Sequence, residues 1–215
     1  MNSEYANNTL THDDVARLAV LVKPYLTEKR YVHTLAVAKE AERLGEIYLP
    51  DKINELKAAA LLHDITKKDD LKKQLHYCEK FGIIVKEFDH LSPKVFHART
   101  AACLAEQDFA SFVNEEIING IRWHTTGRFG MTNFESIVYL ADYIEETRDF
   151  EDCVLLRNYF YGKIDDGEDK TVALIDTMIY SFDLTIGNLI KEGALIDDDT
   201  IGARNYYLIK RSETE

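Results

Sequence analysis

The chain has 215 residues, and its 26 lysines and arginines face 38 aspartates and glutamates, which gives a formal net charge of −12. An excess this acidic argues against a general nucleic-acid binder, because neutralising phosphates requires a basic face. The longest unbroken apolar runs have five residues, far short of the ~18 that a membrane span needs. The three cysteines show no CxxC spacing, so a reducing cytoplasm is the expected compartment. Most of the acidic excess follows residue 139, so a site for a polyanion is expected before it.

Few prolines and glycines interrupt the chain, and apolar residues recur at i, i+3 and i+4 between them, which predicts an all-α fold. Gly45 is expected to end the second helix, and Asp51 to cap the third. The stretch 83–95, which contains Pro93, is expected to be irregular. We expect a single domain over residues 1–215, a helical bundle with a core of about 15–192 and a less regular segment, 193–215. In chain order, helices are predicted over residues 11–27, 29–44, 51–63, 70–81, 97–108, 114–123, 133–147, 151–161 and 168–191.

Two histidines and two aspartates, contributed by three of these helices, form a candidate metal site. His63-Asp64 ends a strongly apolar helix, where a carboxylate is costly unless something satisfies it, and a metal ion would do so. Asp142 interrupts another apolar stretch, and His33 lies on the helix before His63. Two imidazoles and two carboxylates suit iron, manganese, magnesium or zinc, and they leave positions for water and a substrate oxygen.

The order of these motifs resembles the HD-domain metal-dependent phosphohydrolases. The flanking residues are similar to one branch of them, the YqeK-type symmetrical bis(5′-nucleosyl)-tetraphosphatases, which split diadenosine tetraphosphate into two ADP. The resemblance covers roughly residues 15–209, and only loosely the C-terminal stretch 195–205. It is carried by Lys29-Arg30-Tyr31-Val32-His33, His63-Asp64-Ile65-Thr66-Lys67, Phe96-His97-Ala98, Arg122-Trp123-His124-Thr125-Thr126 and Ala141-Asp142-Tyr143 through Arg148.

The resemblance implies a metal site formed by His33, His63, Asp64 and Asp142, occupied most often by iron, with manganese, magnesium, cobalt or zinc as alternatives. It also implies a homodimer. Catalytic roles are implied for Asp64, Lys67, His97 and His124. Substrate contacts are implied for Arg30, His33, Asp64, Ile65, Thr66, Lys67, His97, His124, Thr125, Asp142 and Arg148, with Leu195 and Ile196 in the C-terminal segment near the nucleotide.

The spacing supports two of these assignments independently. Arg30 precedes His33 by three residues and shares its helical face, so a bidentate phosphate binder would lie beside the ion. Lys67 lies about one turn beyond Asp64 and would add a point charge there. The expected reaction is hydrolysis at phosphorus by a metal-activated water.

Two other interpretations stay open. The same site would also serve an HD-type phosphohydrolase of nucleoside monophosphates, triphosphates or cyclic nucleotides. Alternatively, the cluster would be a non-catalytic metal or nucleotide sensor within a helical module. Product identification separates the first alternative from diadenosine tetraphosphate hydrolysis, and tight metal binding without turnover would favour the second.

Overall fold

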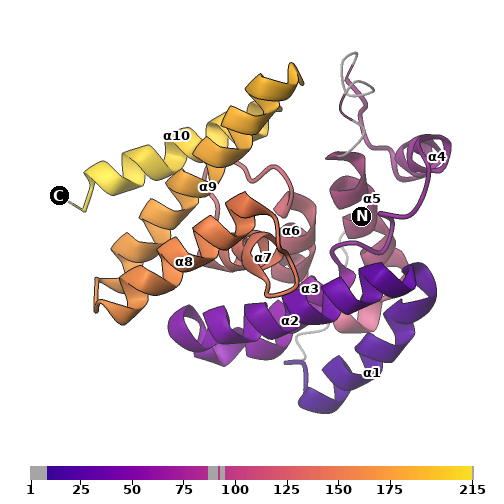
Figure 1. Ribbon diagram of the computed structural model, residues 1–215. Coiled ribbons are helices and arrows are strands. Elements are labelled where there is room, and N and C mark those ends of the chain that lie inside the picture. The colour runs from indigo at the N-terminus through magenta and orange to yellow at the C-terminus, as the bar shows by residue number, and fades with distance from the viewer. Residues whose placement is uncertain (1–8, 87–91, 93–94, 215) are drawn as a thin grey trace.

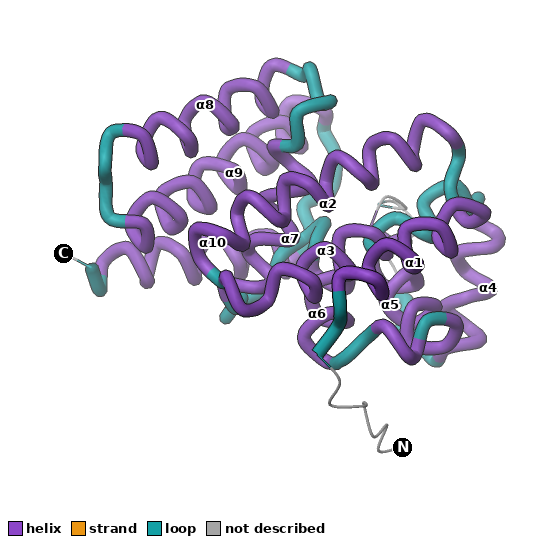
Figure 2. Tube along the Cα trace, turned by 90° about the horizontal axis from the view of Figure 1, so that it is seen from below, coloured by secondary structure: helices purple, strands orange, loops and turns teal. Residues whose placement is uncertain are grey.

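The computed structural model describes residues 9–86, 92 and 95–214, and within them the chain forms ten α-helices and no strand (Figure 1; Figure 2). The all-α prediction is therefore confirmed. None of the helices in these residues is long and apolar enough to cross a membrane. The helices are α1 His12–Val22, α2 Glu28–Tyr48, α3 Ile53–Leu62, α4 Leu71–Phe81, α5 Phe96–Asp108, α6 Glu115–Trp123, α7 Asn133–Ile144, α8 Glu151–Asp165, α9 Lys170–Glu192 and α10 Asp198–Ser212.

Several helix starts are capped by the side chains that the sequence pattern indicates. Thr11 begins α1 in a capping box with Asp14, and its hydroxyl accepts from the Asp14 N–H. The Asp70 carboxylate caps α4 by accepting from the Lys73 N–H, and Gly82 ends that helix with a left-handed φ of 65°. Each cap satisfies backbone groups that a helix end leaves unpaired.

Several predicted boundaries are wrong. The first helix ends at Val22 rather than at Thr27, and α7 ends at Ile144 rather than at Thr147. Gly45 does not end the second helix but lies inside α2, where a Cβ would stand 2.8 Å from Leu56 Cδ1 of α3. Its missing side chain lets α2 and α3 pack closely. Asp51 lies in a short 3-10 turn, Pro50–Lys52, and α3 begins after it with Lys52 at the N-cap and no side-chain cap. Of the stretch expected to be irregular, residues 83–86 are so, whereas Pro93 lies outside the described residues.

The helix α3 occupies the centre of the molecule, packed against α1, α2, α5, α6 and α7 (Figure 1). Its alanines at 58–60 are fully buried, and such small side chains let several neighbours approach at once. His63 and Asp64 follow directly after its last residue. The fold thus brings the polar end of this central helix to the point where α2, α5, α6 and α7 meet.

The C-terminal segment is more regular than its sequence indicates. Asp197 caps α10, and α10 packs along α9. Tyr207 of α10 is buried, and its hydroxyl hydrogen-bonds with Ser136 of α7. At Gly127, which has a φ of 64°, a Cβ would lie 2.7 Å from Phe182 and 2.9 Å from Ala203, so α9 and α10 close directly over the turn after α6.

Candidate metal centre

Four side chains from three parts of the chain converge beyond the end of α3. His33 projects from the second turn of α2, His63 and Asp64 follow α3, and Asp142 lies in the last turn of α7. His33 Nε2 lies 3.0 Å from Asp142 Oδ1 and 3.9 Å from Asp64 Oδ2. His63 Nε2 lies 3.3 Å from Asp64 Oδ2 and 3.7 Å from Asp142 Oδ1. The structure thus brings together the four residues predicted from the sequence as metal ligands.

The orientation of the two imidazoles fits a metal ion. His63 Nδ1 donates to the Ala60 carbonyl at 2.6 Å, which leaves a lone pair on its Nε2. His33 Nδ1 bonds in the same way to Glu145 Oε1 at 3.0 Å. Both Nε2 atoms are buried without a hydrogen-bond partner, because their short distances to the carboxylates lack hydrogen-bond geometry. Buried nitrogens facing two carboxylates in this way suit a shared cation, which would satisfy all four groups.

The surroundings hold both carboxylates ionised. Burial alone raises the pKa of Asp64, but His63 and His97 lower it well below its usual range. The pKa of Asp142 is likewise held well below its usual range, against the effect of burial, by Arg148 and His33. Burial lowers the pKa of His33, and the carboxylates of Asp142 and Glu145 more than offset it and raise the pKa to about 9. In the metal-free protein a proton on His33 Nε2 thus takes the place that an ion would occupy, so the centre is built to receive positive charge.

A second pair of histidines lies on the other side of Asp64. Asp64 Oδ1 is 3.3 Å from His97 Nε2 and 3.8 Å from His124 Nε2. The two Nε2 atoms are 3.0 Å apart, so they contact each other. His124 Nδ1 donates to the Ile121 carbonyl at 2.7 Å, and burial together with His63 and His97 lowers the pKa of His124 well below its ordinary value. His124 is therefore neutral at pH 7.

The six side chains form three overlapping groups whose ligand atoms are close enough to hold an ion. Asp64 belongs to two of these groups, since one of its oxygens faces His63 and the other faces His97. The groups are His33 with His63 and Asp64, His63 with His124 and Asp142, and Asp64 with His97 and His124.

Three basic side chains surround this cluster. Arg30 Nη1 donates to Asp64 Oδ2 at 2.8 Å, and Arg148 Nη2 donates to Asp142 Oδ1 at 2.6 Å. Lys67 Nζ lies 3.0 Å from His97 Nε2. Burial lowers the pKa of Lys67, although Asp64 and Asp142 oppose this effect. These cations stand where phosphate oxygens would meet an ion bound by the carboxylates.

The remaining residues predicted to contact the substrate lie in three different places. Thr125 Oγ1 lies 3.2 Å from His97 Nε2, beside the second histidine pair. Ile65 and Thr66 are buried, and the Thr66 hydroxyl donates to the His97 carbonyl at 2.9 Å, so a substrate contact by these two would have to come from their backbone. Leu195 is exposed and Ile196 half-buried, in the connection that precedes α10.

Sequence reasoning missed Glu145. Its side chain is fully buried, bonds His33 Nδ1, and accepts from the Thr147 hydroxyl at 2.7 Å and from the Thr147 N–H at 2.6 Å. Burial raises the pKa of Glu145, but the bonds from His33 and Thr147 bring it below its ordinary value. A carboxylate at the end of an apolar helix is the same signal that marked Asp64, and it could have identified this residue.

Comparisons with known proteins agree with this geometry. Residues 30–147 match the HD domain family. The chain is similar to proteins named "Bis(5'-nucleosyl)-tetraphosphatase, symmetrical": 32% identical to that of Staphylococcus aureus, over 87% of this chain and 91% of the relative, and 39% identical to that of Bacillus subtilis, over 60% and 68%. A crystal structure from Clostridium acetobutylicum, described as a predicted HD superfamily hydrolase involved in NAD metabolism, superposes with a TM-score of 0.79 at 31% identity. It covers 94% of this chain and all of that one.

The fold and the cluster of histidines and aspartates define a metal-dependent hydrolase of the HD type. The chain belongs to the HD domain family and, within it, to the relatives named symmetrical bis(5′-nucleosyl)-tetraphosphatases.

Proposed function

We infer that this protein hydrolyses diadenosine tetraphosphate symmetrically, into two ADP. The observation that carries the inference is the buried cluster of His33, His63, Asp64 and Asp142, with Arg30, Lys67 and Arg148 around it. Two relatives named for this activity, matched over 91% and 95% of their length at 32% and 30% identity, support the substrate. A net charge of −12 does not oppose it, because a small polyphosphate responds to the local field rather than to the whole surface.

His33, His63, Asp64 and Asp142 would hold the metal ion, and the ion, when bound, supplies a nucleophile at neutral pH by lowering the pKa of water. We propose iron for this site, which metal analysis of the purified protein tests. The chain's own part in the reaction is electrostatic. Arg30 and Arg148 already meet the two carboxylates at 2.8 and 2.6 Å, so they flank the place where the substrate's phosphates would lie.

On the other side of Asp64, Lys67, His97 and His124 are proposed to act on the departing half of the substrate. Lys67 brings a positive charge, and Thr125 a hydroxyl, to the same nitrogen of His97. ADP leaves from a terminal phosphate, which needs little help from a general acid. Lys67 and Thr125 would therefore mainly stabilise the charge that develops on the leaving oxygen, while His124, whose Nδ1 already donates to the Ile121 carbonyl, would position His97 through their Nε2 contact.

Three further proposals concern the C-terminal segment, the oligomeric state and the cellular compartment. We propose that residues 193–215 pack beside the nucleotide, with Leu195 and Ile196 near the base. This is supported by the ion pair between Asp197 and Arg99, at 3.4 Å, since Arg99 stands two residues after His97. We further propose a homodimer in the cytoplasm, and light scattering of the purified protein tests its mass.

Chromatography of the products tests the function. The purified protein should convert diadenosine tetraphosphate into two equivalents of ADP, and Asp64→Ala should not. AMP and ATP as products would contradict symmetrical cleavage. Inertness towards diadenosine tetraphosphate, combined with turnover of NAD, a nucleoside triphosphate or a cyclic nucleotide, would assign the site to another substrate.

A further inference from the structure

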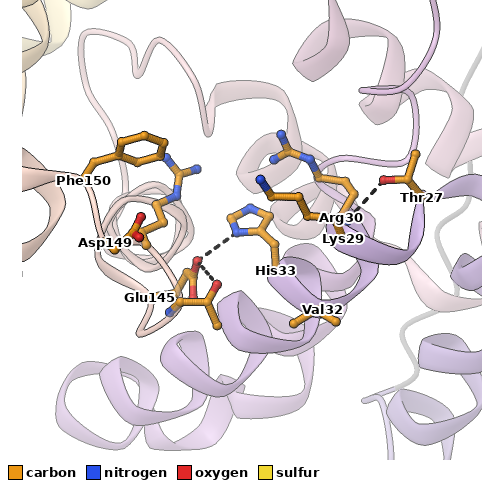
Figure 3. A pocket seen from close by; sticks show the side chains of 10 residues that line it. Thr27, Lys29, Arg30, Val32, His33, Glu145, Asp149 and Phe150 are labelled. Carbon is orange, nitrogen blue, oxygen red and sulfur yellow. Dashed lines mark hydrogen bonds and ion pairs between the residues drawn. The ribbon is translucent and has the colours of Figure 1, made fainter.

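A cavity of about 690 Å³ opens beside the metal centre, between the start of α2 and the connection from α7 to α8 (Figure 3). Its volume falls within the ~300–1,000 Å³ typical of small-molecule sites. His33, Arg30 and Arg148 belong both to this cavity and to the polar cluster. The cavity is therefore continuous with the place where the phosphates would react.

The walls of the cavity combine cations with exposed apolar groups. Lys29 and Arg30 project from the α2 wall, and Phe150 stands across from them with His33 between (Figure 3). Phe150 is 69% exposed and Val32 is 54% exposed. An exposed aromatic ring beside basic side chains suits a ligand with a flat base and phosphates.

Glu145, although it lines the cavity, does not repel such a ligand strongly. Its carboxylate bonds His33 and Thr147, and its side chain is fully buried. Asp149 is the other acidic group in the lining, against Lys29, Arg30 and Arg148. The net charge of the lining is therefore positive.

The residues proposed to stabilise the leaving group lie elsewhere. Lys67 and Thr125 contact His97 Nε2, which faces Asp64 Oδ1, and none of these three residues lines the cavity. Arg30, by contrast, contacts Asp64 Oδ2. The centre thus has two sides, joined by one carboxylate. A substrate cleaved at the middle of four phosphates places one nucleoside diphosphate on each side of the reacting bond.

We propose that this cavity binds the nucleoside of one half of the substrate, with its base against Phe150 and its phosphates between Arg30 and Arg148. This proposal rests on the proposed function. The other nucleoside then lies on the side of His97 and the segment before α10. Phe150 would thereby set the preference for substrates that carry a nucleoside at both ends.

Phe150→Ala tests the subsite kinetically. Loss of one base stack should raise the KM for diadenosine tetraphosphate about tenfold, with little change in kcat, and Phe150→Trp should restore it. Adenosine 5′-tetraphosphate, which has a nucleoside at one end only, can leave the cavity empty, so its KM should hardly change. An unchanged KM for diadenosine tetraphosphate, or an equal rise for both substrates, would overturn the proposal. Val20→Ala, on α1 and equally exposed at 69%, is the matched control.

Equilibrium binding of ADP gives a readout that does not depend on turnover. The wild-type protein should bind two ADP per chain in titration calorimetry, and Phe150→Ala should weaken one of the two about tenfold. A single ADP site in the wild type, or two sites untouched by the substitution, would refute the second subsite. A wild-type protein that binds two ADP but leaves diadenosine tetraphosphate intact would refute the proposed function instead, so the two failures are distinguishable.

Discussion

The two pairs of histidines around Asp64 have the same chemistry but different surroundings. His33 and His63 have Nε2 atoms that are buried without a hydrogen-bond partner and face two carboxylates. The Nε2 atoms of His97 and His124 lie 3.0 Å apart and contact each other. In the first pair, backbone or carboxylate partners on Nδ1 leave the lone pairs directed at a common centre. In the second pair, His97 is additionally approached by Lys67 and Thr125.

The difference separates holding an ion from handling a phosphate. Unsatisfied buried nitrogens cost free energy unless an ion completes them. Imidazoles that already contact each other, beside an ammonium group and a hydroxyl, suit contacts to phosphate oxygens. Substitutions on each side of Asp64 therefore test the comparison, since one side should control metal content and the other should control turnover.

The largest effect is expected for Asp64→Ala, because Asp64 serves both sides. Metal content and turnover should fall together, with activity reduced about a thousandfold or more, equivalent to several kcal/mol of transition-state stabilisation. Metal analysis and kcat/KM on the same preparation measure this. Asp183→Asn, an exposed carboxylate on α9, is the control. Retained activity in metal-depleted Asp64→Ala would disprove the metal mechanism.

Lys67→Ala should affect turnover alone. Loss of one charge-assisted phosphate contact should cost about 2–3 kcal/mol, a factor of roughly 30–150 in kcat/KM, while bound metal stays near the wild-type level. Lys68→Ala is the neighbouring control, because Lys68 Nζ donates to the Pro24 carbonyl instead. If Lys67→Ala lost its metal, the separation between the two sides would fail.

Glu145→Gln should weaken the metal site without removing a ligand. Glu145 orients His33 through Nδ1, and loss of such an orienting carboxylate typically lowers metal affinity about 10–100-fold. Competition with a chelator measures the affinity. Glu146→Gln changes the next carboxylate, which is exposed and pairs with Lys39, and should have no effect. Equal affinities for the two variants would show that His33 needs no such support.

The prediction furthest from turnover concerns the pH dependence of the stability of the metal-free protein. The pKa of His33 is raised from 6.5 to about 9 in the folded state, so its stabilisation is fully present below pH 6.5 and is lost as pH rises through 9. The free energy of unfolding should fall by about 3 kcal/mol across this window, because each unit of difference between the folded and unfolded pKa is equivalent to ~1.4 kcal/mol. Urea titrations measure this free energy for the wild type and for Glu145→Gln at each pH. The difference between the two proteins removes the contributions of thiols and tyrosines that titrate in the same range, because both proteins contain them. A difference that does not change with pH would contradict this.

Much of the helical framework follows from local patterns. Thr11 with Asp14, and Asp70 with Gly82, specify helix ends through neighbours a few residues away, and the structure places them as their sequence indicates. The prediction that Gly45 ends a helix is wrong because a glycine that ends a helix and a glycine that allows close packing cannot be distinguished in sequence. Only the position of Leu56 on α3 distinguishes the two.

The residues of the candidate site also divide into those that a local sequence signal marks and those that only the tertiary structure reveals. His63-Asp64 and Asp142 stand out because each interrupts an apolar stretch, and that signal is local. Phe150 carries no such signal, since an aromatic residue before a helix is ordinarily a core side chain. Its 69% exposure and its place across from Arg30 depend on how the α7–α8 connection passes over α2.

The sequence by itself determined an all-helical chain and pointed to the four candidate ligand residues, because periodicity and buried charge act over short distances or break an apolar pattern. The tertiary structure alone decided which nitrogens lack partners, that Asp64 joins two histidine pairs, and that a cavity opens beside them. Those features depend on packing between segments as distant as Arg30 and Arg148, whose relative positions no local interaction sets.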